Sequence, residues 1–346
     1  MSGRSLFDNQ DNKAMFPAFN PEESFPYIED YELNSWFYIG HYEFDGHKIN
    51  YLYHQMIMAL PGAPALVVSD VSFTDETEGW CDAGDVAIPL ERAERDADGM
   101  KVPNGLIEGT LKKCRIQAEL GSCSVDLTLE STGNILYNGG SGLFPLLGME
   151  VRQYSVPAMK TNGTLTMRGK TYDIRDGHTW FDRQWQHMDG PPEGRWTWMD
   201  LNLDNGDKVS LWGAINRAGE EHSWATILHP DGSLVVVGVE PLSQSESRFW
   251  TSERSGWRYP TQWVVKIPEY DAVLDVIPSP LEQEVVSLVE PLNKYEGASF
   301  VKGTWQGKNV TGHCYVELVG EWKVLTERSV SVTAARIKNE ETRGRH

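Results

Sequence analysis

Residues 196–215 read WTWMDLNLDNGDKVSLWGAI, and this stretch decides the fold class. The residues on each side of the Asn205–Gly206 step alternate in the way expected of a strand with one buried face. An Asn–Gly step supplies the positive backbone φ that a two-residue hairpin turn requires. The stretch therefore predicts an antiparallel hairpin.

The same kind of turn signal recurs along the chain. Asn–Gly or Asp–Gly steps begin at residues 45, 98, 104, 138, 162, 176, 189, 205 and 231, and short alternating segments lie between them. Repeated strand–turn–strand units form antiparallel sheets, and no convincing helical periodicity appears before the C-terminal tail. We expect an all-β protein whose sheets close, or nearly close, into barrels that leave few exposed edges.

Length and composition indicate two domains and an apolar ligand. At roughly 150 residues per domain, a chain of 346 residues predicts two domains. We place an N-terminal arm at 1–24, one barrel at 25–175, a second at 176–323 and a tail at 324–346. The net charge of −19 disfavours nucleic acid and anionic membranes as partners. The 13 Trp, 13 Tyr and 11 Phe residues favour a pocket lined with rings.

Several kinds of site and targeting segment are not expected. No apolar run is long enough for a transmembrane helix, and residues 1–24 have no signal-peptide pattern, so we expect a cytoplasmic protein. The four cysteines have no metal-ligand spacing, and free thiols without a bound metal are expected. No nucleotide, flavin or nicotinamide motif is present, so no cofactor is expected.

The richest chemical stretch is GHTWFDRQWQ at 177–186. As a strand, it places four side chains on one face, namely His178, Trp180, Asp182 and Gln184. Burial beside a tryptophan raises the pKa of a carboxyl group, so Asp182 is a candidate acid. The structural alternative is that Asp182 pairs with Arg183 or with a backbone amide at the join between the barrels.

The opening hairpin supplies a second candidate surface. Alternation places three side chains on one face of its first strand, namely Trp196, Trp198 and Asp200. A two-residue turn would set Trp198 opposite Gly213 and place Trp212 beside Met199 on the other face. These rings suit a flat or polyene ligand, although filling a barrel interior is the commoner role of a tryptophan on a strand.

Five segments, taken in order, resemble the hydroxyneurosporene synthase and AttH-like group of proteins. They are WFYIG at 36–40, QYSVP at 153–157, GHTWFDRQW at 177–185, WRYPTQW at 257–263, and YEG at 295–297 followed by GHCYVELVG at 312–320. The resemblance implies two tandem lipocalin-like barrels and no redox cofactor. The group includes carotenoid hydratases, kievitone hydratase-like enzymes and fungal Diels–Alder cyclases.

For the hydratases of this group, the resemblance implies that the aspartate of a W-x-D motif, here Asp182, protonates an isoprenoid alkene. Gln184 and Gln186 occupy the end of the motif where an acidic residue is usual, so the chain departs from the hydratase pattern there.

The leading functional hypothesis is a cofactor-independent cyclase, of the lyase or isomerase class, that performs a Diels–Alder-type closure in secondary metabolism. Its substrate would be an apolar polyene, terpenoid or polyketide. The expected catalytic residues are Asp182, His178, Gln184 and Tyr154. The expected substrate-binding residues are Trp180, Trp185, Trp196, Trp198, Asp200 and Trp212.

Three alternatives remain open from the sequence. A hydratase or dehydratase would use Asp182 as its acid, a carrier would bind a hydrophobic ligand unchanged, and a glycan-active protein would pair Asp182 with Asp200. The cleft between the barrels is the expected pocket. The sequence sets no oligomeric state.

Overall fold

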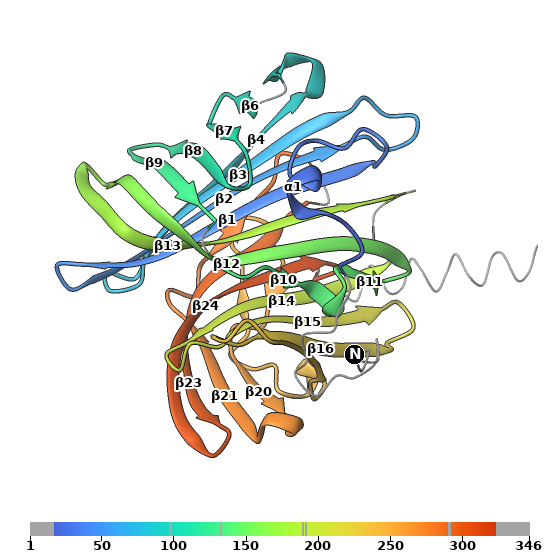
Figure 1. Ribbon diagram of the computed structural model, residues 1–346, viewed down its shortest axis with the longest axis vertical. Coiled ribbons are helices and arrows are strands. Elements are labelled where there is room, and N and C mark those ends of the chain that lie inside the picture. Colours follow the sequence, from blue (N-terminus) through green and yellow to red (C-terminus); the bar gives the residue numbers. More distant parts are fainter. Residues whose placement is uncertain are drawn as a thin grey trace, which may run out of the picture.

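The computed structural model describes residues 17–96, 99–131, 133–188, 190, 192–289 and 292–322, and strands dominate it (Figure 1). The expected tail and most of the expected arm lie outside these residues. Among the described residues, thirteen strands form the first sheet: β1 (Leu33–Phe44), β2 (His47–Met58), β3 (Leu66–Asp75), β4 (Trp80–Pro89), β5 (Glu94–Arg95), β6 (Gly99–Val102), β7 (Gly105–Gly109), β8 (Lys113–Leu120), β9 (Cys123–Glu130), β10 (Leu136–Tyr137), β11 (Leu143–Leu146), β12 (Met149–Met167) and β13 (Lys170–Gln186).

Nine further described strands form the second sheet: β14 (Gly194–Leu203), β15 (Lys208–Asn216), β16 (Glu221–Leu228), β17 (Leu234–Gly238), β20 (Trp263–Ile267), β21 (Ala272–Pro278), β22 (Glu284–Val285), β23 (Lys294–Trp305) and β24 (Lys308–Gly320). A separate ribbon pairs β18 (Trp250–Thr251) with β19 (Arg258–Tyr259). The described helices are short: α1 (Pro21–Ser24), η1 (Leu90–Arg92), η2 (Asn138–Gly140), η3 (Leu242–Gln244) and η4 (Pro268–Tyr270).

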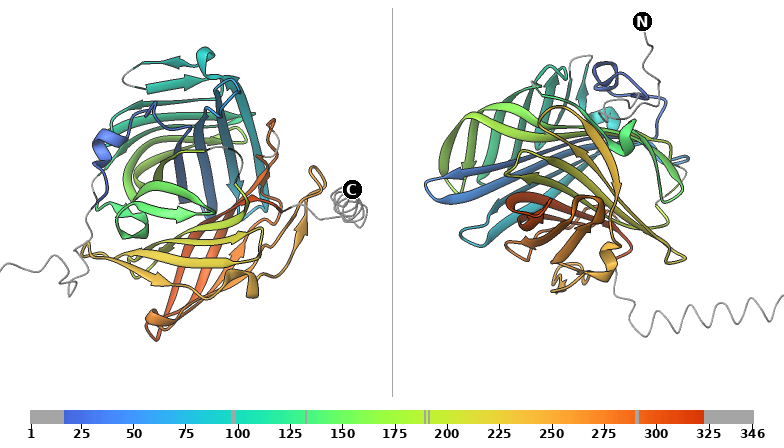
Figure 2. Two further views of the ribbon diagram at one scale, coloured as in Figure 1. Left: turned by 90° about the vertical axis from the view of Figure 1, so that its right-hand side faces the viewer. Right: turned by 60° about the horizontal axis from the view of Figure 1, so that its bottom comes forward.

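Both sheets are antiparallel and curl into half-barrels. The first runs in the order β4-β3-β2-β1-β13-β12-β9-β8-β7-β6-β5, and the second in the order β17-β16-β15-β14-β24-β23-β21-β20. The left view of Figure 2 looks into the curl of the first sheet, with the second sheet packed below it. The predicted all-β architecture of two tandem barrel-like halves is confirmed.

The chain passes from the first sheet to the second later than the expected domain boundary after Arg175. Strand β13 belongs entirely to the first sheet, since its second half pairs with β1 from Gly40↔Thr179 to Leu33↔Gln186. The second sheet begins at Gly194. The division between the sheets therefore falls between Gln186 and Gly194.

Three clusters of buried apolar side chains match this layout. The first fills the curl of the first sheet and includes Trp36, Tyr38 and Phe181. The second fills the curl of the second sheet and includes Met199 and Trp263. The third lies where the two sheets meet, and its members come from both: Phe37, Ile39, Leu52, Leu136, Phe144, Leu146, Val151, Trp180, Trp198, Trp212, Ala214, Leu228, Leu234, Ala298 and Tyr315.

The hairpin of β14 and β15 forms as predicted, but its predicted register is wrong by one residue. Trp198 lies opposite Trp212, and Thr197 lies opposite Gly213. Because side chains alternate along a strand, a shift of one residue moves a side chain to the other face. Trp212 therefore lies on the same face as Trp198, not beside Met199 on the opposite face.

The turn explains the difference. The Leu203 N–H donates to the Asp207 carbonyl at 3.1 Å, and the Gly206 N–H donates back to the Leu203 carbonyl at 3.0 Å. The loop thus contains Asp204, Asn205 and Gly206, with Gly206 at φ 94°. Three-residue hairpin loops with a glycine at positive φ are a common alternative to the two-residue turn.

All four cysteines are free thiols, as the sequence favours. Within the described residues, no helix has both the length and the apolar character needed to cross a membrane.

Candidate functional site

A row of five side chains crosses the first sheet on the face that meets the second sheet. From β12 to β3 the row contains Ser155, Asp182, Phe37, His54 and Asp70, each directly opposite the next in the strand register. Adjacent strands lie about 4.8 Å apart, so neighbours along the row can interact. Phe37 belongs to the cluster between the sheets, which places the row at that interface.

Asp182 is buried within this row and surrounded by donors. The Trp180 indole N–H donates to Oδ1 at 2.7 Å, and the Gln153 amide donates to Oδ2 at 2.9 Å. Burial raises the pKa of Asp182 to about 7, and the charge of Asp200 adds to the rise, while hydrogen bonds from Ser155, Trp180 and Gln153 oppose it. A carboxyl group with such a pKa can both donate and accept a proton near neutral pH.

Aromatic rings surround the acid. The Trp198 ring of the second sheet lies 5.6 Å from the Phe37 ring, perpendicular to it, and 6.1 Å from the Trp180 ring. Phe37 lies opposite Asp182, and Trp180 lies two residues before it on the same face. The Trp198 indole therefore packs against two of the side chains beside the acid. Ser210 accepts the Trp198 indole N–H at 3.0 Å, which fixes the ring.

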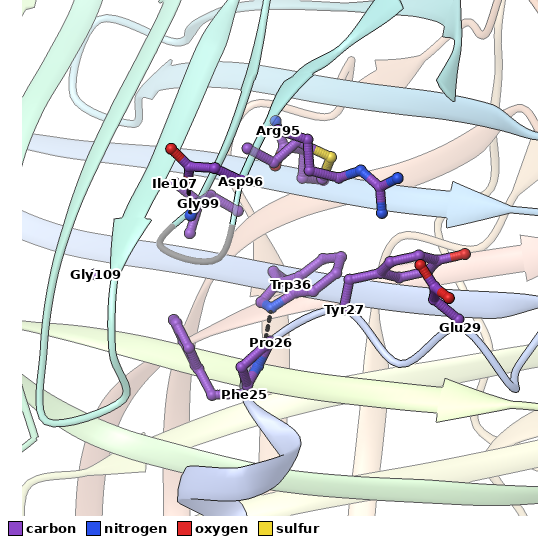
Figure 3. Close-up of a pocket in the computed structure, with 12 residues that line it drawn as sticks. Phe25, Pro26, Tyr27, Glu29, Trp36, Arg95, Asp96, Gly99, Ile107 and Gly109 are labelled. Atoms are coloured by element: carbon purple, nitrogen blue, oxygen red, sulfur yellow. Dashed lines mark hydrogen bonds between the residues drawn. The ribbon is translucent and has the colours of Figure 1, made fainter. Parts of the chain in front are cut away.

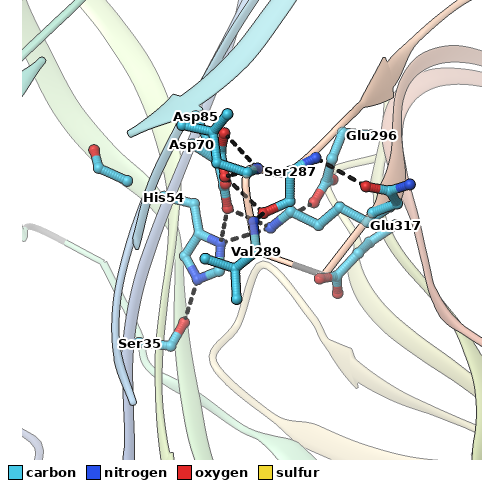
Figure 4. Close-up of polar contacts among 12 residues, drawn as sticks. Ser35, His54, Asp70, Asp85, Ser287, Val289, Glu296 and Glu317 are labelled. Atoms are coloured by element: carbon cyan, nitrogen blue, oxygen red, sulfur yellow. Dashed lines mark hydrogen bonds and ion pairs between the residues drawn. The ribbon is translucent and has the colours of Figure 1, made fainter. Parts of the chain in front are cut away.

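A buried ionic cluster continues the row toward β3 (Figure 4). Lys294, from β23, donates to Asp70 Oδ2 at 2.7 Å and to His54 Nδ1 at 2.8 Å, and its ammonium lies 3.3 Å from Glu296 Oε1. His54 Nδ1 is also 3.0 Å from Asp70, and its Nε2 is 2.8 Å from Ser35 Oγ. These contacts join the two half-barrels.

The charges of this cluster follow from burial and mutual attraction. Burial opposes ionisation of Asp70, but Lys294 and His54 outweigh it and hold the pKa of that carboxyl at about 2. Burial likewise opposes the charge on Lys294, yet the surrounding carboxylates raise its pKa. Burial and the nearby Lys294 lower the pKa of His54 to about 4, despite Asp70. An Asp70 carboxylate, a Lys294 ammonium and a neutral imidazole therefore coexist at neutral pH.

Two further acids close the cluster on the second sheet. Burial raises the pKa of both Glu296 and Glu317, although Lys294 opposes each rise. The half-buried Trp196 covers Glu317 and donates its indole N–H to Oε2 at 3.3 Å. Both acids lie in one strand register with Trp198.

Ser35, His54 and Asp70 contact one another in the order of a nucleophile–base–acid relay. A histidine that takes a proton from serine becomes a cation, and the Lys294 ammonium at 2.8 Å opposes that charge. The cluster therefore suits a fixed link between the sheets better than serine activation.

The family model described as AttH-like matches residues 82–321. The chain belongs to the AttH-like family. This confirms the resemblance seen in the sequence.

Curated relatives of this AttH-like protein include two named for the addition or removal of water. It is 29% identical over 224 residues to the dehydratase asqC of Emericella nidulans, covering 62% of this chain and 63% of the relative. It is 26% identical over 231 residues to the kievitone hydratase of Fusarium solani subsp. phaseoli, covering 64% of each. The chain thus spans less than two thirds of the length of these relatives.

Solved structures share the fold. A putative AttH from Nitrosomonas europaea has a TM-score of 0.76 at 20% identity, covering 89% of this chain and 98% of that one. Kievitone hydratase from Nectria haematococca has a TM-score of 0.73 at 23% identity, covering 89% and 100%. CghA with Sch210972 has a TM-score of 0.55 at 11% identity, covering 88% and 96%. At these identities the likeness establishes the fold alone.

The structure brings some of the expected catalytic residues of the AttH-like protein together and separates others. Trp180, Asp182 and Gln184 lie on the interface face of β13, with Gln184 half-buried and donating to Gln186 at 2.8 Å. His178, which precedes these residues on β13, is exposed to solvent. It is therefore not part of the buried site around Asp182.

Tyr154 and Trp185 lie on the opposite side of the sheet, in the core of the first half-barrel. The Tyr154 hydroxyl donates to the Pro21 carbonyl at 3.0 Å. Arg183 shares that side, so it does not pair with Asp182 as the structural alternative proposed. Strand alternation separates these side chains from the acid.

The expected residues of β14 and β15 mostly face the interface. Trp198 and Trp212 are buried there, with Trp196 half-buried at its rim. Asp200 accepts hydrogen bonds from the Tyr315 backbone N–H and, at 3.1 Å, from the Asn202 side chain. Both hydrogen bonds lie within its own sheet, and its Oδ2 also lies 3.8 Å from His41 Nε2 of the first sheet. Asp200 acts on Asp182 through its charge.

Sequence reasoning missed most of the ionic cluster, namely Asp70, Lys294, Glu296 and Glu317, and left His54 unassigned. A signal was present: Asp70 stands within the apolar run LVVSDVSF at 66–73. A charge inside a buried strand needs a partner. The described residues contain no group of three or more His, Cys, Asp and Glu side chains arranged to hold a metal ion.

Proposed function

We propose that the protein adds water to, or removes water from, a carbon–carbon double bond of an apolar substrate held between the two half-barrels. The observation that carries the proposal is Asp182, a buried carboxyl group with a pKa of about 7 and aromatic neighbours. The names of the two curated relatives, a dehydratase and a hydratase, support it.

In the hydration direction, the Asp182 proton forms a C–H bond with one alkene carbon as the π bond breaks. The other carbon becomes cationic, and rings such as Trp198 and Phe37 stabilise it by about 0.5–2 kcal/mol each. Water then forms the C–O bond and returns one proton to the Asp182 carboxylate. The sum is alkene plus water giving alcohol, and dehydration runs the same steps in reverse.

A pKa near 7 suits both halves of this cycle. A carboxyl group with an ordinary pKa would be ionised at neutral pH and unable to protonate the alkene. Trp180 and Gln153 stabilise the carboxylate left after proton transfer. These two hydrogen bonds therefore lower the energy of the carboxylate intermediate, while the pKa of Asp182 stays high enough for the group to act as an acid.

In this proposal the substrate enters at the half-buried rim of the interface between the two half-barrels. Leu147, Met149 and Trp196 pack against the third apolar cluster, where the two sheets meet, and are partly accessible to solvent, as is Gln184. Gln184 lies two residues from Asp182 on the same face. An apolar molecule entering there meets rings and aliphatic side chains before the acid.

The cyclase predicted from the sequence is the second candidate, and the aromatic surface is the observation that favours it. Trp198, Trp212 and Trp224 lie side by side across β14, β15 and β16, with the last two rings stacked at 6.1 Å and 10°. Such a surface can align two π-systems for ring closure. Cyclisation within one molecule leaves the mass unchanged, whereas hydration changes it by one water.

The test uses a metabolite extract from the source strain with this gene deleted. The purified protein is incubated with the extract in H₂¹⁸O, and products are compared by mass with those of the Asp182→Asn variant. A new compound heavier by one labelled water, or lighter by one water, appears only with the wild type under the proposal. An isomer of unchanged mass would instead support the cyclase, and stoichiometric recovery of an unaltered ligand would support a carrier.

A further inference from the structure

A cavity of about 370 Å³ lies at the mouth of the first half-barrel, apart from the interface site (Figure 3). Its walls come from the segment after α1 and from strands β1, β2, β5, β6 and β7. The lining includes Phe25, Trp36, Gln55, Arg95, Met100 and Ile107. The volume lies within the range of roughly 300–1,000 Å³ found for small-molecule pockets.

The buried Arg183 does not line the cavity, but it supports one wall from behind. Its guanidinium donates to the Ser24 carbonyl at 2.9 Å and to the Pro26 carbonyl at 2.8 Å, and it lies 4.3 Å from the Trp36 ring. The Trp36 indole N–H donates to the Phe25 carbonyl at 2.7 Å. The segment over the barrel mouth is therefore fixed to β13 and β1, so the wall exists before any ligand binds.

Gln55 is the unexplained group in this wall. It lies directly opposite Trp36 in the register of β1 and β2, and its side chain is completely buried. Neither its amide nitrogen nor its amide oxygen has a hydrogen-bond partner. Buried polar groups are nearly always paired, so an amide with both atoms unpaired beside a cavity requires an explanation.

We infer that this cavity binds a small apolar ring compound that carries a hydrogen-bond donor and an acceptor side by side, as a carboxamide or a lactam does. The Gln55 amide offers the complementary pair, with an N–H for the acceptor and a carbonyl for the donor. Phe25, Trp36, Met100 and Ile107 enclose the apolar part. A few polar groups that orient a ligand in an apolar pocket are typical of small-molecule sites.

This site does not depend on the proposed water chemistry. Trp36 and Gln55 face into the first half-barrel, whereas their strand neighbours Phe37 and His54 face the second sheet. Asp182 belongs to that second face. Binding in the cavity can therefore be measured on a protein that lacks the acid.

The first experiment compares three probes on the wild-type protein by isothermal titration calorimetry: naphthalene-2-carboxamide, 2-acetylnaphthalene and naphthalene. The carboxamide has a donor and an acceptor, the ketone has an acceptor only, and the hydrocarbon has neither. We expect one carboxamide per chain, bound at least about tenfold more tightly than naphthalene, with the ketone between them. Equal affinity for all three probes, or no binding of the carboxamide, would overturn the inference.

The second experiment places the site. Gln55→Leu should weaken the carboxamide by at least about tenfold and leave naphthalene unchanged or tighter. Gln117→Leu, which alters a glutamine on the outer face of the same half-barrel, and Asp182→Asn should change neither affinity. Circular dichroism checks that each variant is folded. If Gln55→Leu fails to fold, Ile107→Phe, which narrows the cavity, should weaken every probe. Unchanged carboxamide affinity in the folded cavity variant contradicts the assignment.

Discussion

Trp180 donates its indole N–H to the Asp182 carboxylate across 2.7 Å, from two positions earlier on the same strand. Residues i and i+2 share a face of a strand, so the W-x-D spacing by itself brings the two side chains together. The bond favours the ionised acid, whereas burial favours the neutral one. Their balance sets the pKa of Asp182 at about 7.

Removing this donor should raise the pKa of Asp182. In Trp180→Phe the ring remains but the N–H is lost, so the carboxylate loses part of its stabilisation. If Asp182 is the acid, activity falls as pH rises through its pKa. In Trp180→Phe this fall in activity should occur at a higher pH than in the wild type. The pH–rate profile measures this shift. Trp185→Phe, on the same strand but the opposite face, is the control, and an equal shift there would refute the local cause.

Asp182 also makes stability depend on pH. The unfolded carboxyl ionises near pH 4 and the folded one near pH 7, so between these values the folded state holds a proton that the unfolded state has lost. Stability contributed by this group is therefore present below pH 4 and lost as pH rises to 7. The free energy of unfolding of Asp182→Asn, relative to that of the wild type, should therefore rise between pH 4 and pH 7, by at most about 4 kcal/mol.

Urea unfolding at pH 4.5 and pH 8 measures this difference. The exposed Asp173→Asn should show little change between the two conditions. His54 has the opposite dependence, because a lowered histidine pKa removes stability as pH falls from 6.5 to about 4. The comparison with wild type at each pH cancels that contribution. If the difference in unfolding free energy between Asp182→Asn and the wild type is the same at pH 4.5 and pH 8, the raised pKa of Asp182 is contradicted.

Lys294 should be essential to the interface. Replacing it with methionine leaves the buried carboxylate of Asp70 without its ammonium partner, and breaking a buried pair in this way costs about 3–5 kcal/mol. Adding Asp70→Asn to Lys294→Met should recover part of that loss. Thermal unfolding measures both. The exposed Lys302→Met on the same strand is the control, and equal losses in the two single variants would count against the cluster.

Arg183 should hold the segment over the barrel mouth. Arg183→Met leaves the Ser24 and Pro26 carbonyls without this donor. Ser24 is buried, and an unsatisfied buried group costs roughly 1–3 kcal/mol. We expect the variant to lose stability and to exchange backbone amide hydrogens faster around Phe25 than the wild type. Arg175→Met, exposed on the same strand, is the comparison. Unchanged exchange around Phe25 would show that the guanidinium does not fix the segment.

The sequence was enough to predict the class of fold. Asn–Gly and Asp–Gly turns are local signals, and Asp45–Gly46 forms the expected two-residue hairpin tip, with both residues at positive φ. Alternation also placed Trp180 and Asp182 together. The register of β14 and β15 was missed because Asn205–Gly206 fits a two-residue or a three-residue loop equally well.

The ionic cluster was beyond sequence reasoning for a different reason. His54 and Lys294 are 240 positions apart in the chain and meet only because two separate sheets pack face to face. Periodicity shows which side chains share a face, but it does not show which faces oppose each other. The cavity beside Gln55 likewise depends on how the first sheet curls.

The most direct test follows the Asp182 carboxyl itself during a pH titration. Carboxyl ¹³C chemical shifts of protein labelled at aspartate are compared between the wild type and Asp182→Asn, so that the missing signal identifies the residue. We expect a carboxyl that stays protonated at pH 5.5 and titrates near pH 7. A signal that is already fully ionised at pH 5.5 would contradict the claim that this protein keeps a neutral acid between its two half-barrels.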